Sequence, residues 1–229
     1  MEYLNTLITG MGSYVPSEVI KNDTFVQQEF YSEKQEKLES PGEEIISKFN
    51  EITGIRERRY IKKDQLVSDI AAIAAQRAIE DANIDPETID QIICAHNFGD
   101  IHNGSTQTDI LPSIASKVKH ILKIKNPSCV AYDILFGCPG WVQGMIQANA
   151  YAKSGLGKRF LVIGAEALSR VVDPYDRDTM IYSDGAGAAI IEVVEEKEKR
   201  GFLSSSMQTD TFDEAYFLYM GKSNKPGFE

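Results

Sequence analysis

Cysteine is scarce in this chain, and long apolar runs are missing. The 229 residues include three cysteines, Cys94, Cys129 and Cys138, and no CxxC pair. This pattern argues against a disulfide framework and favours reduced thiols in a reducing compartment. No apolar run approaches the roughly 20 residues that cross a bilayer, and residues 1–15 lack the basic segment and cleavage site of a signal peptide. We therefore expect a soluble, cytoplasmic protein with no membrane partner.

Basic residues are outnumbered by acidic ones. Lys and Arg total 24 against 34 Asp and Glu, which gives a formal net charge of -10. A nucleic-acid-binding protein needs a basic face to neutralise phosphates, so no nucleic-acid partner is expected. Two local basic clusters, residues 56–63 and 117–125, fit either a binding patch or solvated side chains on exposed faces. The 42% hydrophobic content can fill the core of one domain, or of two small ones.

Periodicity along the chain predicts alternating strands and helices. Strands are expected over 3–11, 89–95, 129–135, 160–165, 188–194 and 202–207. Helices are expected over 43–49, 68–83, 111–122 and 138–154, with a polar surface excursion over 22–42. A turn at Gly10–Gly12 is expected to end the first strand, and Ser68 is expected to be an N-cap. Such alternation is typical of an α/β domain in which helices cover a mainly parallel sheet.

Cys138 lies in the segment Phe136-Gly137-Cys138-Pro139-Gly140-Trp141, between a predicted strand and a helix expected to start at the proline. Proline suits the first helical position because its missing N–H would have no partner there. The thiol would then lie at a helix amino terminus, where the macrodipole and unpaired N–H groups favour thiolate. We interpret Cys138 as an activated nucleophile; a buried, inert thiol is the alternative. Cys94 and Cys129, each at a predicted strand, are expected in the core.

Metal and dinucleotide sites are not expected. His96 and His102 in a loop, and His120 late in a helix, are interpreted as ordinary polar residues. The spacing of Cys94, His96 and His102 fits no tetrahedral metal pattern, so no metal ligand is assigned. The block Asp184-Gly185-Ala186-Gly187 lacks the third glycine of a dinucleotide fingerprint and leads into a strand. We expect a tight bend there, in which Asp184 accepts backbone N–H groups.

Four short blocks follow one another along the chain: Thr53-Gly54-Ile55-Arg56-Glu57-Arg58, Ala131-Tyr132-Asp133, Asp173-Pro174-Tyr175-Asp176-Arg177 and Ser183-Asp184-Gly185-Ala186-Gly187-Ala188-Ala189. Together they resemble the β-ketoacyl-[acyl-carrier-protein] synthase III family over residues 7–210. The resemblance implies an α/β, thiolase-like fold layered with helices, whose first βαβαβαββ half contains a mixed five-stranded sheet. Residues 1–200 are then expected to be the amino-terminal half that carries the nucleophile, and residues 201–229 the incomplete start of the carboxyl-terminal half.

The resemblance implies a two-step acyl transfer. Cys138 would attack an acyl thioester, on coenzyme A or on an acyl-carrier protein, and form an acyl-cysteine. A malonyl thioester on a carrier protein would then lose carbon dioxide, and its carbanion would attack the acyl group. Enzymes of this kind begin fatty-acid synthesis or a related lipid or polyketide pathway, as homodimers. They use a coenzyme A thioester as substrate and hold no permanently bound cofactor, and the Cys138 N–H would supply one oxyanion donor.

The resemblance also implies three substrate-binding residues. Arg177 would lie beside the coenzyme A entrance, where a guanidinium suits phosphate or adenine; an ion pair with Asp173, Asp176 or Asp178 is the alternative. Arg56, in the first block, is assigned to the same substrate. Leu111 stands where the family often places an aromatic residue that closes the partner subunit's acyl pocket, which predicts a longer or bulkier acyl group. Residues 41–52 lack the family's tryptophan and arginine around the adenine ring, which leaves a carrier protein as an alternative donor.

The histidine and asparagine that stabilise the enolate in this family have no matching setting in the sequence. The 229-residue chain alone is therefore expected to be poor at condensation. A non-catalytic partner or acyl-binding half-subunit is an alternative, as is an enzyme similar to hydroxymethylglutaryl-coenzyme A synthase or to a polyketide-starter synthase. Rapid labelling of Cys138 by iodoacetamide near neutral pH, with a detectable acyl adduct, would favour the catalytic interpretations.

Overall fold

A five-stranded mixed sheet forms the centre of the computed structural model, which describes residues 2–228. Its strand order is β1-β9-β8-β4-β7. The strand bounds are β1 (Tyr3–Tyr14), β4 (Gln91–Ala95), β7 (Val130–Ile134), β8 (Arg159–Glu166) and β9 (Gly185–Glu196). β4 is parallel to β7 and β8, whereas β9 is antiparallel to both β8 and β1. The mixed sheet predicted from the sequence is confirmed, with the three parallel strands grouped on one side.

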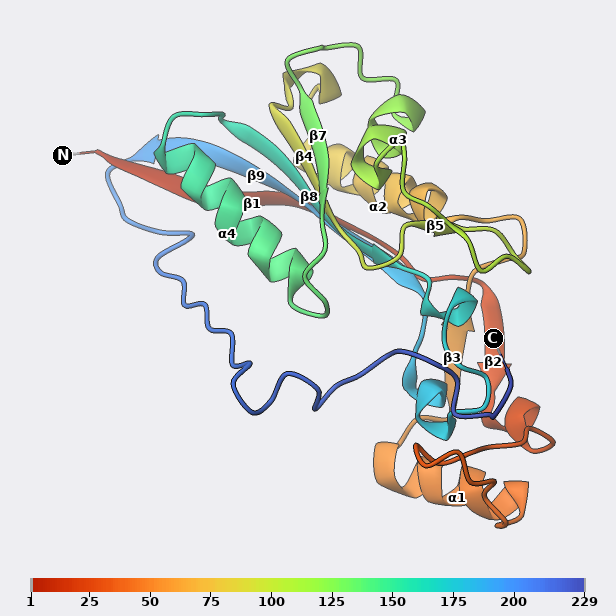
Figure 1. Ribbon diagram of the computed structural model, residues 1–229. Coiled ribbons are helices and arrows are strands. Elements are labelled where there is room, and N and C mark those ends of the chain that lie inside the picture. Colours follow the sequence, from red (N-terminus) through yellow and green to blue (C-terminus); the bar gives the residue numbers. More distant parts are fainter. Residues whose placement is uncertain (1, 229) are drawn as a thin grey trace.

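Helices cover both faces of the sheet (Figure 1). α2 (Val67–Ala82) and α3 (Ile114–Ile121) lie on one face, and α4 (Gly140–Lys153) lies on the other. Neighbouring residues on one strand point to different cores, as when Ile92 packs with α2 and α3 but Ile93 packs with α4. No helix in the described part of the chain combines the length and the apolar content that a bilayer crossing needs.

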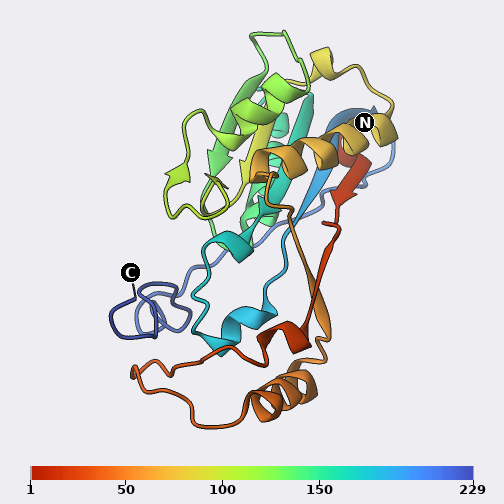
Figure 2. The ribbon, with the colours of Figure 1, turned by 90° about the vertical axis from the view of Figure 1, so that its right-hand side faces the viewer.

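A smaller group of elements extends away from the sheet (Figure 2). It contains β2 (Glu18–Lys21), η1 (Asn22–Phe25), α1 (Gly42–Thr53), β3 (Glu57–Tyr60) and η4 (Arg177–Ile181). Buried Arg58 joins these elements, because its guanidinium donates to the carbonyls of Met180 and Ile20 and to Asn22 Oδ1. Short elements complete the chain: η2 (Pro86–Thr88), β5 (Asp100–Ile101), β6 (Thr108–Asp109) and η3 (Leu168–Arg170).

The glycine turn expected at Gly10–Gly12 is wrong. β1 runs through both glycines as far as Tyr14. A Cβ on Gly10 would overlap the Ala78 carbonyl oxygen of α2, and a Cβ on Gly12 would overlap that of Ala74. These glycines therefore let α2 pack closely against β1, which is a different use of glycine from the turn that the sequence suggested.

Ser68 is not the N-cap of α2. Leu66 is the residue before the helix, and its N–H donates to Asp69 Oδ2 at 2.9 Å. A carboxylate from the first turn therefore pairs with the backbone N–H of the N-cap residue. Ser68 lies inside that turn and donates its hydroxyl to Oδ2 of the buried Asp100 at 2.8 Å. Asp100 also accepts from Lys117 at 2.9 Å, so the serine serves a buried polar contact between elements.

The segment after β9 carries no strand, so the prediction over 202–207 is wrong. Between residues 197 and 228 the structure contains neither helix nor strand. The Phe202 N–H donates to the Thr6 carbonyl at 3.0 Å, but no ladder continues from it. The chain then reaches the smaller group of elements, where Asp173 accepts from Ser223 Oγ and from the Asn224 N–H.

Candidate active site

The carboxyl ends of three parallel strands meet at one edge of the sheet. β4 ends at Ala95, β7 at Ile134 and β8 at Glu166, and Ala95 is in register with Ile134. Loops that follow parallel strands gather at this edge, which is where open α/β sheets usually place their ligands. Cys138 follows β7 after a short loop, so the candidate nucleophile lies there.

A tight turn presents Cys138 just before α4. Gly137 has a left-handed φ of 63°, and its carbonyl accepts the Gly140 N–H at 3.0 Å. The Pro139 carbonyl accepts the N–H of Gln143, so α4 begins at Gly140, and the expected helix start at the proline is wrong by one position. Cys138 is exposed, and no group in residues 2–228 accepts its backbone N–H. Its thiol and its N–H are therefore both available to a substrate.

The other two cysteines lie in the core, as predicted. Cys94 is fully buried on β4, and Cys129, next to β7, is almost fully buried. Burial raises the pKa of both thiols, and for Cys94 the carboxylates of Asp133, Glu166 and Asp100 add to the shift. Both thiols are thus held in the protonated form and away from solvent.

His96 is buried and belongs to a hydrogen-bond network. Its Nδ1 accepts the Gly99 N–H at 3.0 Å, which leaves Nε2 to donate to Asp133 Oδ2 at 2.8 Å. Asp133 also accepts two N–H groups of the first turn of α3, so the network ties the loop after β4 to that helix. His102 and His120 are exposed. No three His, Cys, Asp or Glu side chains among residues 2–228 are grouped as a metal site requires.

Asp184 accepts backbone N–H groups, as predicted. Its carboxylate accepts from Ile61 at 2.9 Å and from Ser169 at 3.0 Å. The residues after it form β9, so the glycines of this block open an interior strand of the sheet, between β1 and β8.

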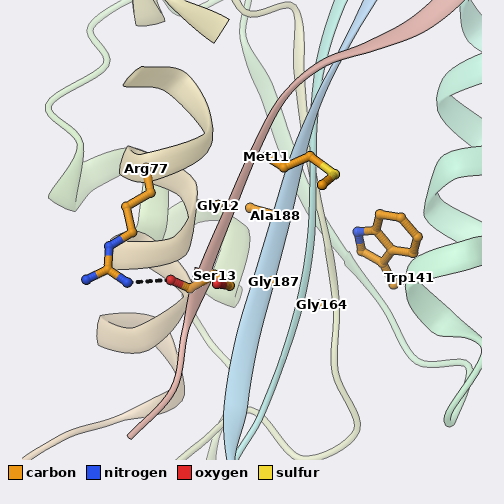
Figure 3. A pocket seen from close by; sticks show the side chains of 8 residues that line it. All are labelled: Met11, Gly12, Ser13, Arg77, Trp141, Gly164, Gly187 and Ala188. Atoms are coloured by element: carbon orange, nitrogen blue, oxygen red, sulfur yellow. Dashed lines mark hydrogen bonds between the residues drawn. The ribbon is translucent and has the colours of Figure 1, made fainter. Parts of the chain in front are cut away.

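An open hollow lies between α4 and β1 (Figure 3). Its cavity volume is about 630 Å³, and Met11 extends from β1 toward Trp141 on α4. A Cβ on Gly164 would lie 3.2 Å from the Trp141 Cβ, so the glycine leaves room for the indole. Cys138 does not line this hollow, although Trp141 follows it within one helical turn.

Comparisons with known proteins agree with this geometry. The family model described as 3-oxoacyl-[acyl-carrier-protein] synthase III matches residues 132–211, which include Cys138. The β-ketoacyl-[acyl-carrier-protein] synthase III of Neisseria meningitidis is 36% identical over 204 residues, which cover 89% of this chain and 56% of the relative. That of Staphylococcus haemolyticus is 36% identical over 220 residues, which cover 96% and 62%. The chain belongs to the β-ketoacyl-[acyl-carrier-protein] synthase III family.

Solved structures of synthase III proteins share the fold. The enzyme from Aquifex aeolicus superposes with a TM-score of 0.66 at 32% identity, over 82% of this chain and 54% of that one. The priming β-ketosynthase of the R1128 polyketide pathway gives a TM-score of 0.64 at 25% identity, over 83% and 50%. The thiolase-like α/β fold predicted from the sequence is thereby confirmed. The chain spans 56% to 62% of the length of the curated synthases described above.

The residues assigned to substrate binding through the synthase III resemblance are all exposed. Arg177, on η4, has its Nε 3.5 Å from Asp178 Oδ1, so the ion pair considered as an alternative is present at the surface. Arg56 lies between α1 and β3, and Leu111 lies shortly before α3. No hydrogen bond or ion pair among residues 2–228 joins any of the three to Cys138, and their roles stay predictions.

Three side chains that the sequence alone does not single out lie around Cys138. Asn97 Oδ1 accepts the Gly137 N–H at 3.1 Å, and Glu166 accepts from Asn97. Burial raises the pKa of Tyr182, and the nearby Cys138 sulfur raises it further. Asn97 follows β4, and Glu166 ends β8, so the order of the parallel strands would have placed both beside the end of β7.

Proposed function

We propose that this protein supplies the acyl-accepting part of a condensing enzyme, with Cys138 as the nucleophile. The observation that carries the proposal is the placement of one exposed thiol at the carboxyl edge of the parallel strands, with its own N–H unpaired in the described chain. Membership of the synthase III family, whose model covers this segment, supports the same chemistry.

The proposed first step is acyl transfer to sulfur. The Cys138 thiolate attacks the carbonyl carbon of an acyl thioester, and the Cys138 N–H donates to the oxyanion that forms. The C–S bond to the donor breaks, the donor leaves as a thiol after taking up a proton, and an acyl-cysteine remains. In the second step a malonyl-carrier protein loses carbon dioxide. The resulting carbanion attacks the acyl carbonyl and expels the Cys138 thiolate.

The proposal extends to substrates and assembly. The acyl donor is a coenzyme A thioester or an acyl-carrier protein, and no cofactor stays bound. Arg177 and Arg56 contact the donor, and Leu111 contributes to an acyl pocket in a partner subunit of a cytoplasmic homodimer. Residues 1–200 form the half that carries the nucleophile, and residues 201–229 begin the other. Fatty-acid initiation is the first candidate pathway. Similarity to the R1128 priming β-ketosynthase makes a polyketide starter role the second.

Intact-mass measurement tests the acyl-transfer step. The chain is incubated with acetyl-coenzyme A, with longer acyl-coenzyme A thioesters and with acyl-carrier protein, and peptide mapping locates the adduct. We expect one acyl group, on Cys138. Cys138→Ala should abolish the adduct, and the matched change Cys129→Ala should leave it in place. No adduct from any thioester, or an adduct on another cysteine, would overturn the proposal.

The condensation step is tested separately with malonyl-carrier protein. The isolated chain should decarboxylate this substrate weakly or not at all, because the enolate-stabilising histidine and asparagine settings of the family are missing from it. Carbon dioxide release measures the step. Robust turnover by the isolated chain would contradict this expectation.

A further inference from the structure

Both backbone polar groups of Gly137, the residue before Cys138, are held by hydrogen bonds. The Gly137 carbonyl accepts the Gly140 N–H at 3.0 Å, and its N–H donates to Asn97 Oδ1 at 3.1 Å. The first contact is local to the turn. The second comes from the loop after β4, 40 residues earlier. A glycine with a φ of 63° has wide conformational freedom, so these contacts decide which conformation is kept.

Glu166 fixes the orientation of the Asn97 side chain. Its Oε2 accepts the Asn97 backbone N–H at 2.7 Å and the Asn97 Nδ2–H at 2.8 Å. An ionised carboxylate only accepts, so the amide must turn its NH2 group toward Glu166. The Asn97 carbonyl oxygen is then aimed at the Gly137 N–H. One carboxylate at the end of β8 thereby controls an acceptor beside the turn that follows β7.

Glu166 is held in this position although burial disfavours its charge. Burial raises the pKa of this carboxyl above its usual value, and the hydrogen bonds from Asn97 and Ala167 partly oppose the shift. Its two oxygens point to the loop after β4 and to the Ala167 N–H. The contacts Glu166 to Asn97 to Gly137 thus connect the ends of all three parallel strands.

We propose that Asn97 and Glu166 are positioning residues: by holding the Phe136–Gly137 peptide they fix the turn at Gly137, so that the N–H of the next residue, Cys138, faces the oxyanion formed during acyl transfer. The inference rests on the proposed function of Cys138. Rotation about the Gly137 backbone would re-aim that N–H. An oxyanion donor is effective only when it is already oriented before the charge develops.

The test compares two reactions of the same sulfur. Acetyl transfer from acetyl-coenzyme A passes through an oxyanion, whereas alkylation by iodoacetamide is a direct displacement and forms none. Asn97→Ala should slow acetylation roughly 10- to 100-fold while alkylation changes less than about threefold. Asn97 is exposed, so its removal should leave the core intact. Asn103→Ala removes an exposed amide from the next loop, between β5 and β6, where it is bound to Arg170 instead of the turn, and should change neither rate.

Glu166 provides the second pair of variants. Glu166→Gln keeps an oxygen that accepts from Asn97 and should retain acetylation within about threefold, whereas Glu166→Ala should lose at least about tenfold. Parallel loss of acetylation and alkylation in Asn97→Ala and Glu166→Ala would indicate a merely structural role and overturn the proposal. Unchanged acetylation in both would also overturn it.

Hydrogen exchange at the Gly137 amide separates this inference from the proposed function. If the wild-type chain forms no acyl adduct with any of the thioesters, the proposed function fails, and the exchange rate still decides whether Asn97 holds the turn. Asn97→Ala should then speed Gly137 exchange at least about tenfold while β8 amides keep their protection. An unchanged Gly137 rate would overturn the positioning role whatever the acetylation result.

Discussion

Asp184 joins three separate parts of the chain through one buried carboxylate. Its oxygens accept the Ile61 N–H, the Ser169 N–H and the Ser169 hydroxyl, the last at 2.6 Å. Its own N–H donates to the Arg59 carbonyl at 2.8 Å. The tight bend expected at this block is wrong, because β9 begins directly at Gly185. Because a carboxylate accepts at both oxygens, the start of β9 is fixed against β3 and η3 together.

Asp184→Asn should lower the free energy of unfolding by about 2 to 3 kcal/mol. In either orientation the new amide turns its NH2 group toward the Ile61 or the Ser169 N–H, which leaves a buried donor without an acceptor. Urea unfolding measures the loss. Asp178→Asn makes the same change on an exposed side chain and should stay within about 0.5 kcal/mol of wild type. Equal losses in the two variants would contradict the role given to Asp184.

Glu166 gives the stability a pH dependence of definite sign. Its pKa is raised in the folded state, chiefly by burial, so the folded protein binds more protons than the unfolded chain between the two pKa values. As the pH rises through that window, ionisation of Glu166 therefore lowers the free energy of unfolding. Below the pKa that Glu166 has in the unfolded chain, this destabilisation is absent. The Glu166→Gln variant cannot ionise at this position. Its free energy of unfolding should therefore rise relative to that of the wild type as the pH increases from about 4 toward neutral. Urea unfolding of both proteins across this range is the measurement, and a difference that does not change with pH would contradict it.

The residues around Cys138, and Cys138 itself, differ in how far the sequence alone predicts their place in the structure. Cys138 can be singled out because its signal is local: a strand, a glycine turn and a helix follow one another within a few residues. Asn97 and Glu166 cannot, because each is polar in an unremarkable local context. Both side chains lie close to Gly137 because β4 is placed between β7 and β8. That strand order is a property of the whole sheet.

At the scale of elements, the packing of α2 on β1 depends on two glycines. Gly12→Ala should lower the free energy of unfolding by about 3 kcal/mol, because the new methyl would overlap the backbone of α2 at Ala74 and Ala78, which cannot move aside as a side chain can. Gly187→Ala is the matched control on β9. No atom lies within 4 Å of its added Cβ, so the change should be neutral or stabilise by up to about 1 kcal/mol. Urea midpoints measure both, and a tolerated Gly12→Ala would contradict the close contact.

The periodicity of the sequence predicts most helices and strands, because the hydrogen bonds or the burial pattern of each depend on residues close together in the chain. The alanine and isoleucine repeat of α2 is an example, and the apolar run of β8 is another. Two predictions failed for one physical reason. Gly10 and Gly12 end no strand, and residues 202–207 form none, because both outcomes depend on which distant segment lies alongside. The α/β class followed from the alternation of strands and helices, whereas the thiolase-like fold followed from the resemblance of the four blocks. The division at residue 200 stays a prediction.

At the scale of the whole molecule, the carboxyl-terminal segment is the most accessible part of the described chain. Phe212 is 97% exposed, and the large side chains from Tyr216 to Tyr219 are also exposed, with neither helix nor strand around them. Chymotrypsin, which cleaves after large apolar side chains, should therefore cut first within residues 212–220. Mass analysis of a short digestion locates the cut. Fully buried Phe160 serves as the internal control, and an early cut beside it would contradict this picture.

Because Cys138 is exposed and the other two cysteines are buried, a thiol-reactive label can be attached at a single position of the unmodified sequence. Cys94 and Cys129 are closed off inside the protein, whereas Cys138 is open to reagents. A maleimide dye or nitroxide would therefore attach at one known point, with no need to engineer other thiols away. Because that point is the turn before α4, changes in emission or in probe mobility would register a ligand arriving at this edge of the sheet, even one that never reacts.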